Sequence, residues 1–221
     1  MEKRTGKEVA AAVGLALLSA GILGCFPVMV DSSAGQAAPI SAEGNRSAFR
    51  DSMRTLWANH AIWTREYIVS AIAGGPDAAD LADRLLKNKD DIAAAFAAYY
   101  GDKTGAALAE LLKQHILIAA DLVDAAKTAN DGKFGDSNRR WHENADAIAA
   151  FLNGINPLWT KTMLLAMFND HLTLTTAEVN SRVGKKWTDD ISAFDKTFAH
   201  MTTMADVLSN GVIRQFPEKF Q

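Results

Sequence analysis

Three of the five histidines recur at nearly equal intervals, at His60, His115 and His171, which are 55 and 56 residues apart. Neutral imidazole is the commonest ligand for transition metals in proteins, and three imidazoles around an open fourth position form a familiar zinc or copper site. Glu178 follows His171 by seven residues, so its carboxylate would return to the same helix face and complete the ligand set. The sequence therefore predicts a metal site made of His60, His115, His171 and Glu178, with zinc or copper as its cofactor.

The same histidines also admit a structural interpretation. Buried polar groups in proteins are hydrogen-bonded, and the imidazole nitrogens could be satisfied by Thr64, Thr175, Asn88 or Asn144. A bond from each asparagine to a histidine would also fix the register of two neighbouring helices. In this interpretation the histidines are polar members of a core, and the sequence alone leaves both interpretations open.

The residues around each histidine repeat as well, and they indicate how the imidazoles are positioned. Apolar residues at positions −7, −4, −3 and +8 lie on the helix face that carries the histidine. Each imidazole should therefore point into the interior of a helical bundle. In the order of the three copies, these apolar positions are Met53, Leu108 and Leu164; Leu56, Leu111 and Met167; Trp57, Leu112 and Phe168; and Ile68, Val123 and Val179.

A second helix is expected after each histidine helix. The segments 88–93, 144–149 and 187–192 each place an aspartate two residues before an isoleucine, and we align them as the second helices of three hairpins. The third hairpin would then have a shorter connection than the first two, and His142 and His200 fall outside the repeat. One hairpin cannot bury its apolar face alone, so the three must pack together.

The chain is predicted to be all-α, an antiparallel bundle of about six helices built from three degenerate hairpins. A closed bundle is favoured over an extended solenoid because only three copies are present. Short loops make the first, third and fifth helices parallel, so the histidines can share a layer, with two of them facing each other across a four-helix core. Capping residues, glycines and prolines place the helices at about 46–73, 76–99, 102–128, 136–153, 157–183 and 186–209, followed by a tail at 212–221.

The first 37 residues are predicted to be an export signal or lipoprotein leader with a flexible tail, and residues 38–221 a single helical domain. A basic start precedes an uncharged run over residues 9–30, as in secretory signals. Residues 18–25 resemble a bacterial lipobox, which would place a lipid on Cys25. Cleavage after Ala37 and an uncleaved membrane anchor are the alternatives. Each of them places the protein in the periplasm or cell envelope.

Composition excludes several classes of function. Cys25 is the only cysteine, so no intramolecular disulfide, thiolate metal site or covalent haem attachment is expected. The net charge of −3 and the absence of a lysine or arginine run argue against nucleic-acid binding. No paired Glu-x-x-His motif, nucleophile elbow or phosphate-binding glycine loop occurs, so a di-iron protein or a conventional hydrolase is not expected. A noncovalent haem between two of the histidines remains an alternative.

The chain resembles a family of exported bacterial helical proteins that have no established activity. This resemblance implies export and a helical fold, and it carries over no catalytic or binding residue. Its motifs cover most of the chain after the leader, namely residues 56–60, 63–65, 84–88, 91–92, 99–101, 115–120, 141, 144–146, 171–175 and 215–217.

The leading hypothesis from the sequence is an exported, noncatalytic bundle that binds a metal ion or small ligand at an internal histidine layer. The alternative is a structural or protein-interaction bundle of the cell envelope. An enzyme that uses a metal bound by the same histidines is a third hypothesis.

Overall fold

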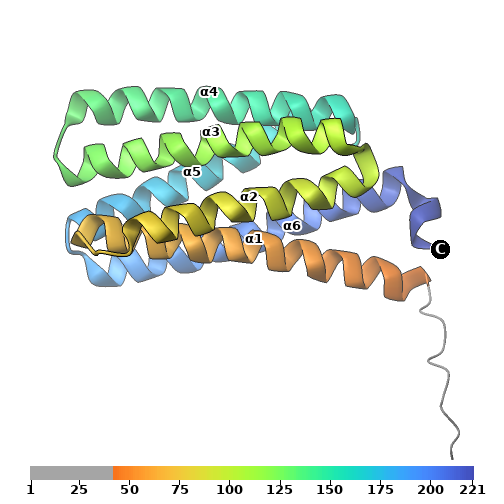
Figure 1. Ribbon diagram of the computed structural model, residues 1–221, viewed down its shortest axis with the longest axis horizontal. Helices are drawn as coiled ribbons and strands as arrows, with labels where there is room; N and C mark the ends of the chain where they lie inside the picture. The colour runs from red at the N-terminus through yellow and green to blue at the C-terminus, as the bar shows by residue number, and fades with distance from the viewer. Residues whose placement is uncertain (1–41) are drawn as a thin grey trace, which may run out of the picture. The chain divides into compact units, whose positions relative to one another are not determined.

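Six α-helices and one short 3-10 helix account for nearly all of residues 42–221, the part of the chain that the computed structural model describes (Figure 1). No strand occurs among these residues, so the predicted all-α class is confirmed. The elements are α1 (Ala42–Ala73), α2 (Ala78–Tyr100), α3 (Asp102–Lys127), α4 (Asp131–Ile155), α5 (Lys161–Val183), α6 (Trp187–Gln215) and the 3-10 helix η1 (Pro217–Phe220).

Short turns join consecutive helices, which therefore alternate in direction along the bundle (Figure 1). Each helix packs against its neighbours in the sequence, and α6 returns to pack against α1. The three histidine helices α1, α3 and α5 also contact one another directly. The amide of Asn45 near the start of α1 donates to the backbone carbonyl of Gln221 (3.2 Å), which closes the ring at that end. The bundle is thus a closed ring of three hairpins, and the first four helices do not form a separate four-helix core.

The core is built from the apolar positions that repeat around each histidine. At −7, −3 and +8 every residue is buried, and α1 contributes Met53, Trp57 and Ile68. The corresponding residues of α3 and α5 have the same burial because the two helices present the same face to the interior. The prediction that the histidine face of each helix points inward is therefore confirmed.

The third hairpin is aligned differently from the prediction. Ile191 is 57% exposed, whereas Ile92 and Ile148 are fully buried, so Ile191 is not their counterpart. The counterpart is Met204, which lies 56 residues after Ile148 and is also fully buried. With this register, His200 occupies the position of the asparagine four residues earlier in the other two hairpins. The prediction of a shorter third connection, and of a His200 outside the repeat, was wrong.

Helices α1, α4 and α5 start four or five residues away from the predicted positions, and capping residues explain the starts of α4 and α5. Asn130 caps α4, since its side chain accepts a hydrogen bond from the backbone N–H of Lys133 (3.0 Å), so the helix begins before the expected cap at residues 136–137. Thr160 caps α5 through the N–H of Met163 (3.3 Å), and Pro157 lies in the preceding turn. Several residues in each loop were able to cap a helix, and the sequence did not distinguish among them.

The last helix runs past the glycine that was expected to end it. Gly211 lies inside α6 at a position where a Cβ atom would collide with the indole ring of Trp159. This close approach is the reason for the glycine, and the helix continues to Gln215. The predicted tail at 212–221 is therefore wrong, because Val212, Ile213 and Phe220 are buried.

The predicted leader, with its lipobox, its alternative cleavage site and its alternative membrane anchor, lies outside the described residues. Of the helices within residues 42–221, none combines the length and the apolar character that crossing a membrane requires.

Candidate functional site

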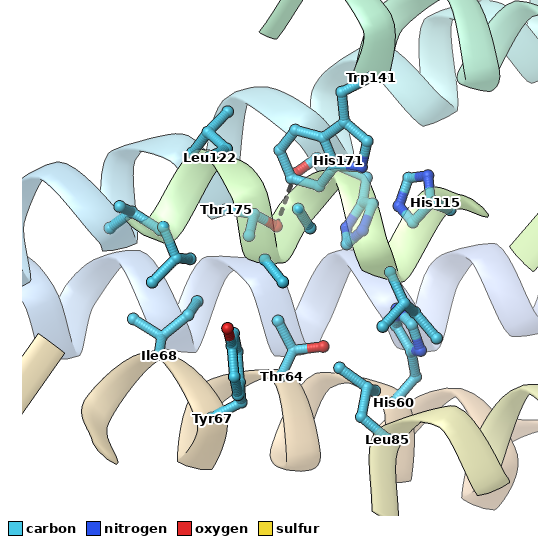
Figure 2. A pocket seen from close by; sticks show the side chains of 15 residues that line it. His60, Thr64, Tyr67, Ile68, Leu85, His115, Leu122, Trp141, His171 and Thr175 are labelled. Carbon is cyan, nitrogen blue, oxygen red and sulfur yellow. Dashed lines mark hydrogen bonds between the residues drawn. The ribbon is translucent and has the colours of Figure 1, made fainter. Parts of the chain in front are cut away.

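The three repeated histidines meet in one layer inside the bundle. His171 lies between the other two, with its ring centroid 6.1 Å from that of His60 and 5.7 Å from that of His115. All three side chains are buried, at 3–5% exposure. Figure 2 shows His60 reaching the layer from α1, opposite His115 of α3 and His171 of α5. The structure therefore brings together three of the four predicted site residues.

Two of these histidines are held by asparagines in the second helix of their own hairpin. Nδ1 of His60 lies 3.3 Å from Oδ1 of Asn88, and Nδ1 of His115 lies 3.0 Å from Oδ1 of Asn144. The amide nitrogen of each asparagine donates to a backbone carbonyl four residues before the histidine, at Leu56 (3.0 Å) and Leu111 (3.1 Å). We call this arrangement of histidine, asparagine and carbonyl a clasp.

The clasp determines which imidazole nitrogen carries the proton. Because the asparagine nitrogen already faces a carbonyl, only its oxygen faces the ring, and an amide oxygen only accepts. Nδ1 of His60 and of His115 must therefore donate. Burial lowers the pKa of His60 to about 4, and burial together with nearby His60 lowers the pKa of His115 to about 3. Both rings are thus neutral at pH 7, with the lone pair on Nε2.

The third hairpin has a histidine in place of the asparagine. Nε2 of His200 donates to the backbone carbonyl of Met167 (2.9 Å), which again lies four residues before the repeated histidine. The rings of His171 and His200 are parallel within 7°, with centroids 6.4 Å apart. Nδ1 of His171 faces no amide oxygen and is buried without a hydrogen-bond partner among residues 42–221. Burial, followed by the neighbouring histidines, lowers the pKa of His171 well below its usual value.

A small cavity lies beside the histidine layer. Its volume is about 20 Å³, and its lining includes all three repeated histidines, Trp141 and Thr175 (Figure 2). The hydroxyl of Thr175 is not available to an imidazole because it donates to the backbone carbonyl of His171 (3.0 Å). A cavity of this size holds about one water molecule or one ion. It has no room for a haem or another organic ligand.

The arrangement supplies imidazole acceptors but no finished coordination sphere. Within residues 42–221, no three histidine, cysteine or carboxylate side chains already surround a point where a metal ion would be coordinated. An ion in this layer would require the rings to move closer together, because zinc binds imidazole nitrogen at about 2.0–2.1 Å.

Glu178 does not belong to the histidine layer. Its carboxylate accepts a hydrogen bond from Arg65 (2.9 Å), and Arg65 also forms a two-pronged ion pair with Asp190. Arg182 completes this buried ionic cluster through Asp190 (3.2 Å). Seven residues return to one helix face but advance about 10 Å along the axis, which separates Glu178 from His171. The prediction of Glu178 as a ligand of the histidine layer was wrong for this reason.

The ion pairs and the burial of the ionic cluster shift the pKa values of its side chains. Burial raises the pKa of Glu178 against the opposing effect of Arg65. Burial acts in the same direction on Asp190, but the hydrogen bonds from Arg65 and Arg182 outweigh it, and the pKa of Asp190 is lowered. The hydrogen bond to Asp190 is also the main reason that the pKa of Arg65 is raised. These groups are therefore committed to one another, which fits a structural role at the junction of α1, α5 and α6.

Two features of the site were missed from the sequence. The arginine and aspartate partners of Glu178 come from other helices and have no local signal. His200 did have one, because it follows His171 by 29 residues, as Asn144 follows His115. The remaining histidine, His142, pairs with Asn169 (2.9 Å) away from the layer.

Comparison of this chain with models of protein families, with curated proteins and with solved structures gives no significant match, so the histidine layer is interpreted on its own geometry.

Proposed function

We propose that this protein binds one transition-metal ion, zinc or copper, in the layer formed by His60, His115 and His171. The observation that carries the proposal is the pair of clasps, which hold two neutral imidazoles in this layer with the proton on Nδ1 and therefore the lone pair on Nε2. A transition-metal ion can accept the lone pairs of several such imidazoles at once.

The clasps also have the form of an outer coordination shell. In metal sites the second nitrogen of a histidine ligand usually donates to a carbonyl, carboxylate or similar acceptor, which fixes the ring and its tautomer. Asn88 and Asn144 supply this acceptor to His60 and His115. The lowered pKa values favour binding as well, because a ligand imidazole must be deprotonated.

The ligand type indicates the class of ion. Three imidazoles suit zinc and copper, whereas calcium and magnesium prefer oxygen ligands. The cavity leaves room for the ion and at most a small fourth ligand, so the proposed role is binding or storage and not catalysis on an organic substrate. The rings would draw together around the ion, with His171 in the centre of the layer.

The test is elemental analysis and calorimetric titration of zinc and copper into the untagged protein. We expect one ion per chain in the parent, and no stoichiometric binding in a variant with His60, His115 and His171 all changed to Gln. The matched control is His142→Gln, which removes an imidazole outside the layer and should bind as the parent does. Absence of stoichiometric binding in the parent contradicts the proposal.

The second candidate is a structural or protein-interaction bundle in which the histidines only hold hairpins in register. The hydrogen bonds of Asn88 and Asn144 favour it, since each already satisfies one imidazole nitrogen and one backbone carbonyl. Under this candidate the triple variant loses stability while neither protein binds an ion.

Export to the cell envelope is the remaining part of the proposal. It rests on the basic start and the uncharged run over residues 9–30. Cell fractionation with mass spectrometry of the mature N-terminus tests it. A lipid on Cys25 that is lost in Cys25→Ser supports anchoring, a start at residue 38 supports simple secretion, and an intact cytoplasmic chain contradicts export.

A further inference from the structure

His200 differs from the residues that occupy the same position in the other hairpins. Asn88, Asn144 and His200 all donate to the carbonyl four residues before a repeated histidine. Only His200 brings a second imidazole to that position. The replacement is not needed for the backbone contact, which an asparagine makes equally well in the first two hairpins.

His200 is also the one imidazole of the group that reaches solvent. His60, His115 and His171 are buried, whereas His200 is only partly buried. Among these residues His200 contacts His171, and His171 in turn contacts both His60 and His115. The four rings therefore form a path from the surface to the cavity, with His171 in the middle.

In the third hairpin, Nδ1 of His200 and Nδ1 of His171 are the imidazole nitrogens that can act along this path. Because Nε2 of His200 faces a carbonyl oxygen, it carries a proton, and in the neutral ring Nδ1 is an acceptor. Nδ1 of His171 has no hydrogen-bond partner within residues 42–221. In the other two hairpins this nitrogen is occupied by an amide oxygen. The third hairpin thus leaves the central imidazole uncommitted on the nitrogen that the other copies block.

We propose that His200 is the loading residue of the site, which captures the metal ion at the surface and passes it to His171, and through His171 to His60 and His115. This inference rests on the proposed function. In this proposal His200 controls the rate of metal loading, whereas the three buried imidazoles determine the dissociation constant.

The test is stopped-flow measurement of zinc and copper loading in the metal-free full chain, compared with the affinity from calorimetry. The variant His200→Asn recreates the clasp of the other hairpins and should keep the fold. We expect its loading rate to fall by about tenfold or more, while the dissociation constant changes by less than about threefold, a difference worth under about 0.7 kcal/mol. A matched control, His142→Asn, removes a histidine that pairs with Asn169 outside the path and should load at the parent rate.

Nitrogen-15 NMR of the imidazoles checks the clasp directly. His200→Asn should give His171 the Nδ1–H tautomer of His60 and His115. If His200→Asn does not fold, His200→Gln replaces it, since the longer amide can still donate to the carbonyl of Met167.

The outcomes separate this inference from the one it rests on. No binding in the parent overturns both. Binding in the parent with unchanged loading in the His200 variant overturns the role of His200 and leaves the three-histidine site intact. Equal losses of rate and affinity also overturn it, because His200 would then act as an ordinary ligand or as a structural residue.

Discussion

Asn88 and Asn144 each satisfy two buried groups with one amide. The oxygen of each accepts from a histidine of the preceding helix, and the nitrogen donates to that helix's backbone. At the residue scale this pair of hydrogen bonds connects function with folding, because the same side chain sets the register of a hairpin and the tautomer of a proposed ligand.

Replacing Asn144 by leucine tests the clasp. Asn144→Leu retains much of the volume but leaves Nδ1–H of His115 buried without its acceptor, whereas the carbonyl of Leu111 keeps its helical hydrogen bond within α3. We expect a loss of about 1–3 kcal/mol in the free energy of unfolding, as for one unsatisfied buried group. Urea denaturation measures it. Asn169→Leu, which breaks an exposed pair with His142, is the control and should change stability by less than about 0.5 kcal/mol.

The buried histidines predict a dependence of stability on pH. The pKa values of His60 and His115 are about 4 and 3 in the folded protein and near 6.5 when unfolded. Between these values the unfolded chain binds more protons, so stability is greatest above pH 6.5 and falls as the pH decreases. Each histidine contributes a slope of about 0.7 kcal/mol per pH unit at pH 6.5, where the unfolded imidazole is half protonated, and this slope approaches about 1.4 kcal/mol per pH unit near pH 5.

Denaturation of the metal-free protein between about pH 7 and pH 5.5 measures this slope in a range where most carboxylates do not titrate. His115→Gln should reduce the slope by one histidine's share. A parent whose stability is constant over that range would show that the imidazoles are not buried in the neutral form.

At the scale of the elements, the helix count and the inward face of each histidine helix were predictable because they depend on periodicity. The starts of α4 and α5 were not, since neighbouring residues competed as caps. The register of the third hairpin was missed because His200 replaces the asparagine of the other two hairpins. Both side chains donate to a backbone carbonyl, but an alignment of residue types does not show this equivalence. The extent of α6 depends on contact with Trp159, a residue distant in the sequence.

Gly211 gives the sharpest test at this scale. In Gly211→Ala the new methyl group meets the buried indole of Trp159, so we expect overpacking to cost about 1–3 kcal/mol despite the better helix propensity of alanine. Gly154→Ala in α4 is the control, because no neighbouring atom lies within 4 Å of the place its Cβ would take. There alanine should stabilise the helix by about 0.5–1 kcal/mol. Thermal melts should therefore shift in opposite directions.

At the scale of the whole molecule, the ionic cluster links the first hairpin to the third. Arg65 of α1 pairs with Glu178 of α5 and Asp190 of α6, and the side chains of both carboxylates are 1% exposed. Paired charges of this kind are costly to break because the remaining partner stays buried. The cluster lies where the ring of hairpins closes.

Arg65→Ala should therefore destabilise the bundle by about 3–5 kcal/mol, since it leaves two buried carboxylates with Arg182 alone. Chemical denaturation measures the loss. Arg139→Ala, which breaks exposed pairs with Asp136 and Glu143, should cost less than about 1 kcal/mol. Equal effects of the two substitutions would show that the cluster does not hold the ring closed.

The hydrogen bond between Asn45 and the carbonyl of Gln221 has a consequence for connectivity. It brings the two ends of the described chain to the same place, so each hairpin has a neighbour on both sides and none is terminal in space. A circular permutant that joins these ends and opens the turn between α2 and α3, or the turn between α4 and α5, would preserve every helix–helix interface. The chain could therefore begin with any of the three hairpins, and the helices would pack against the same neighbours.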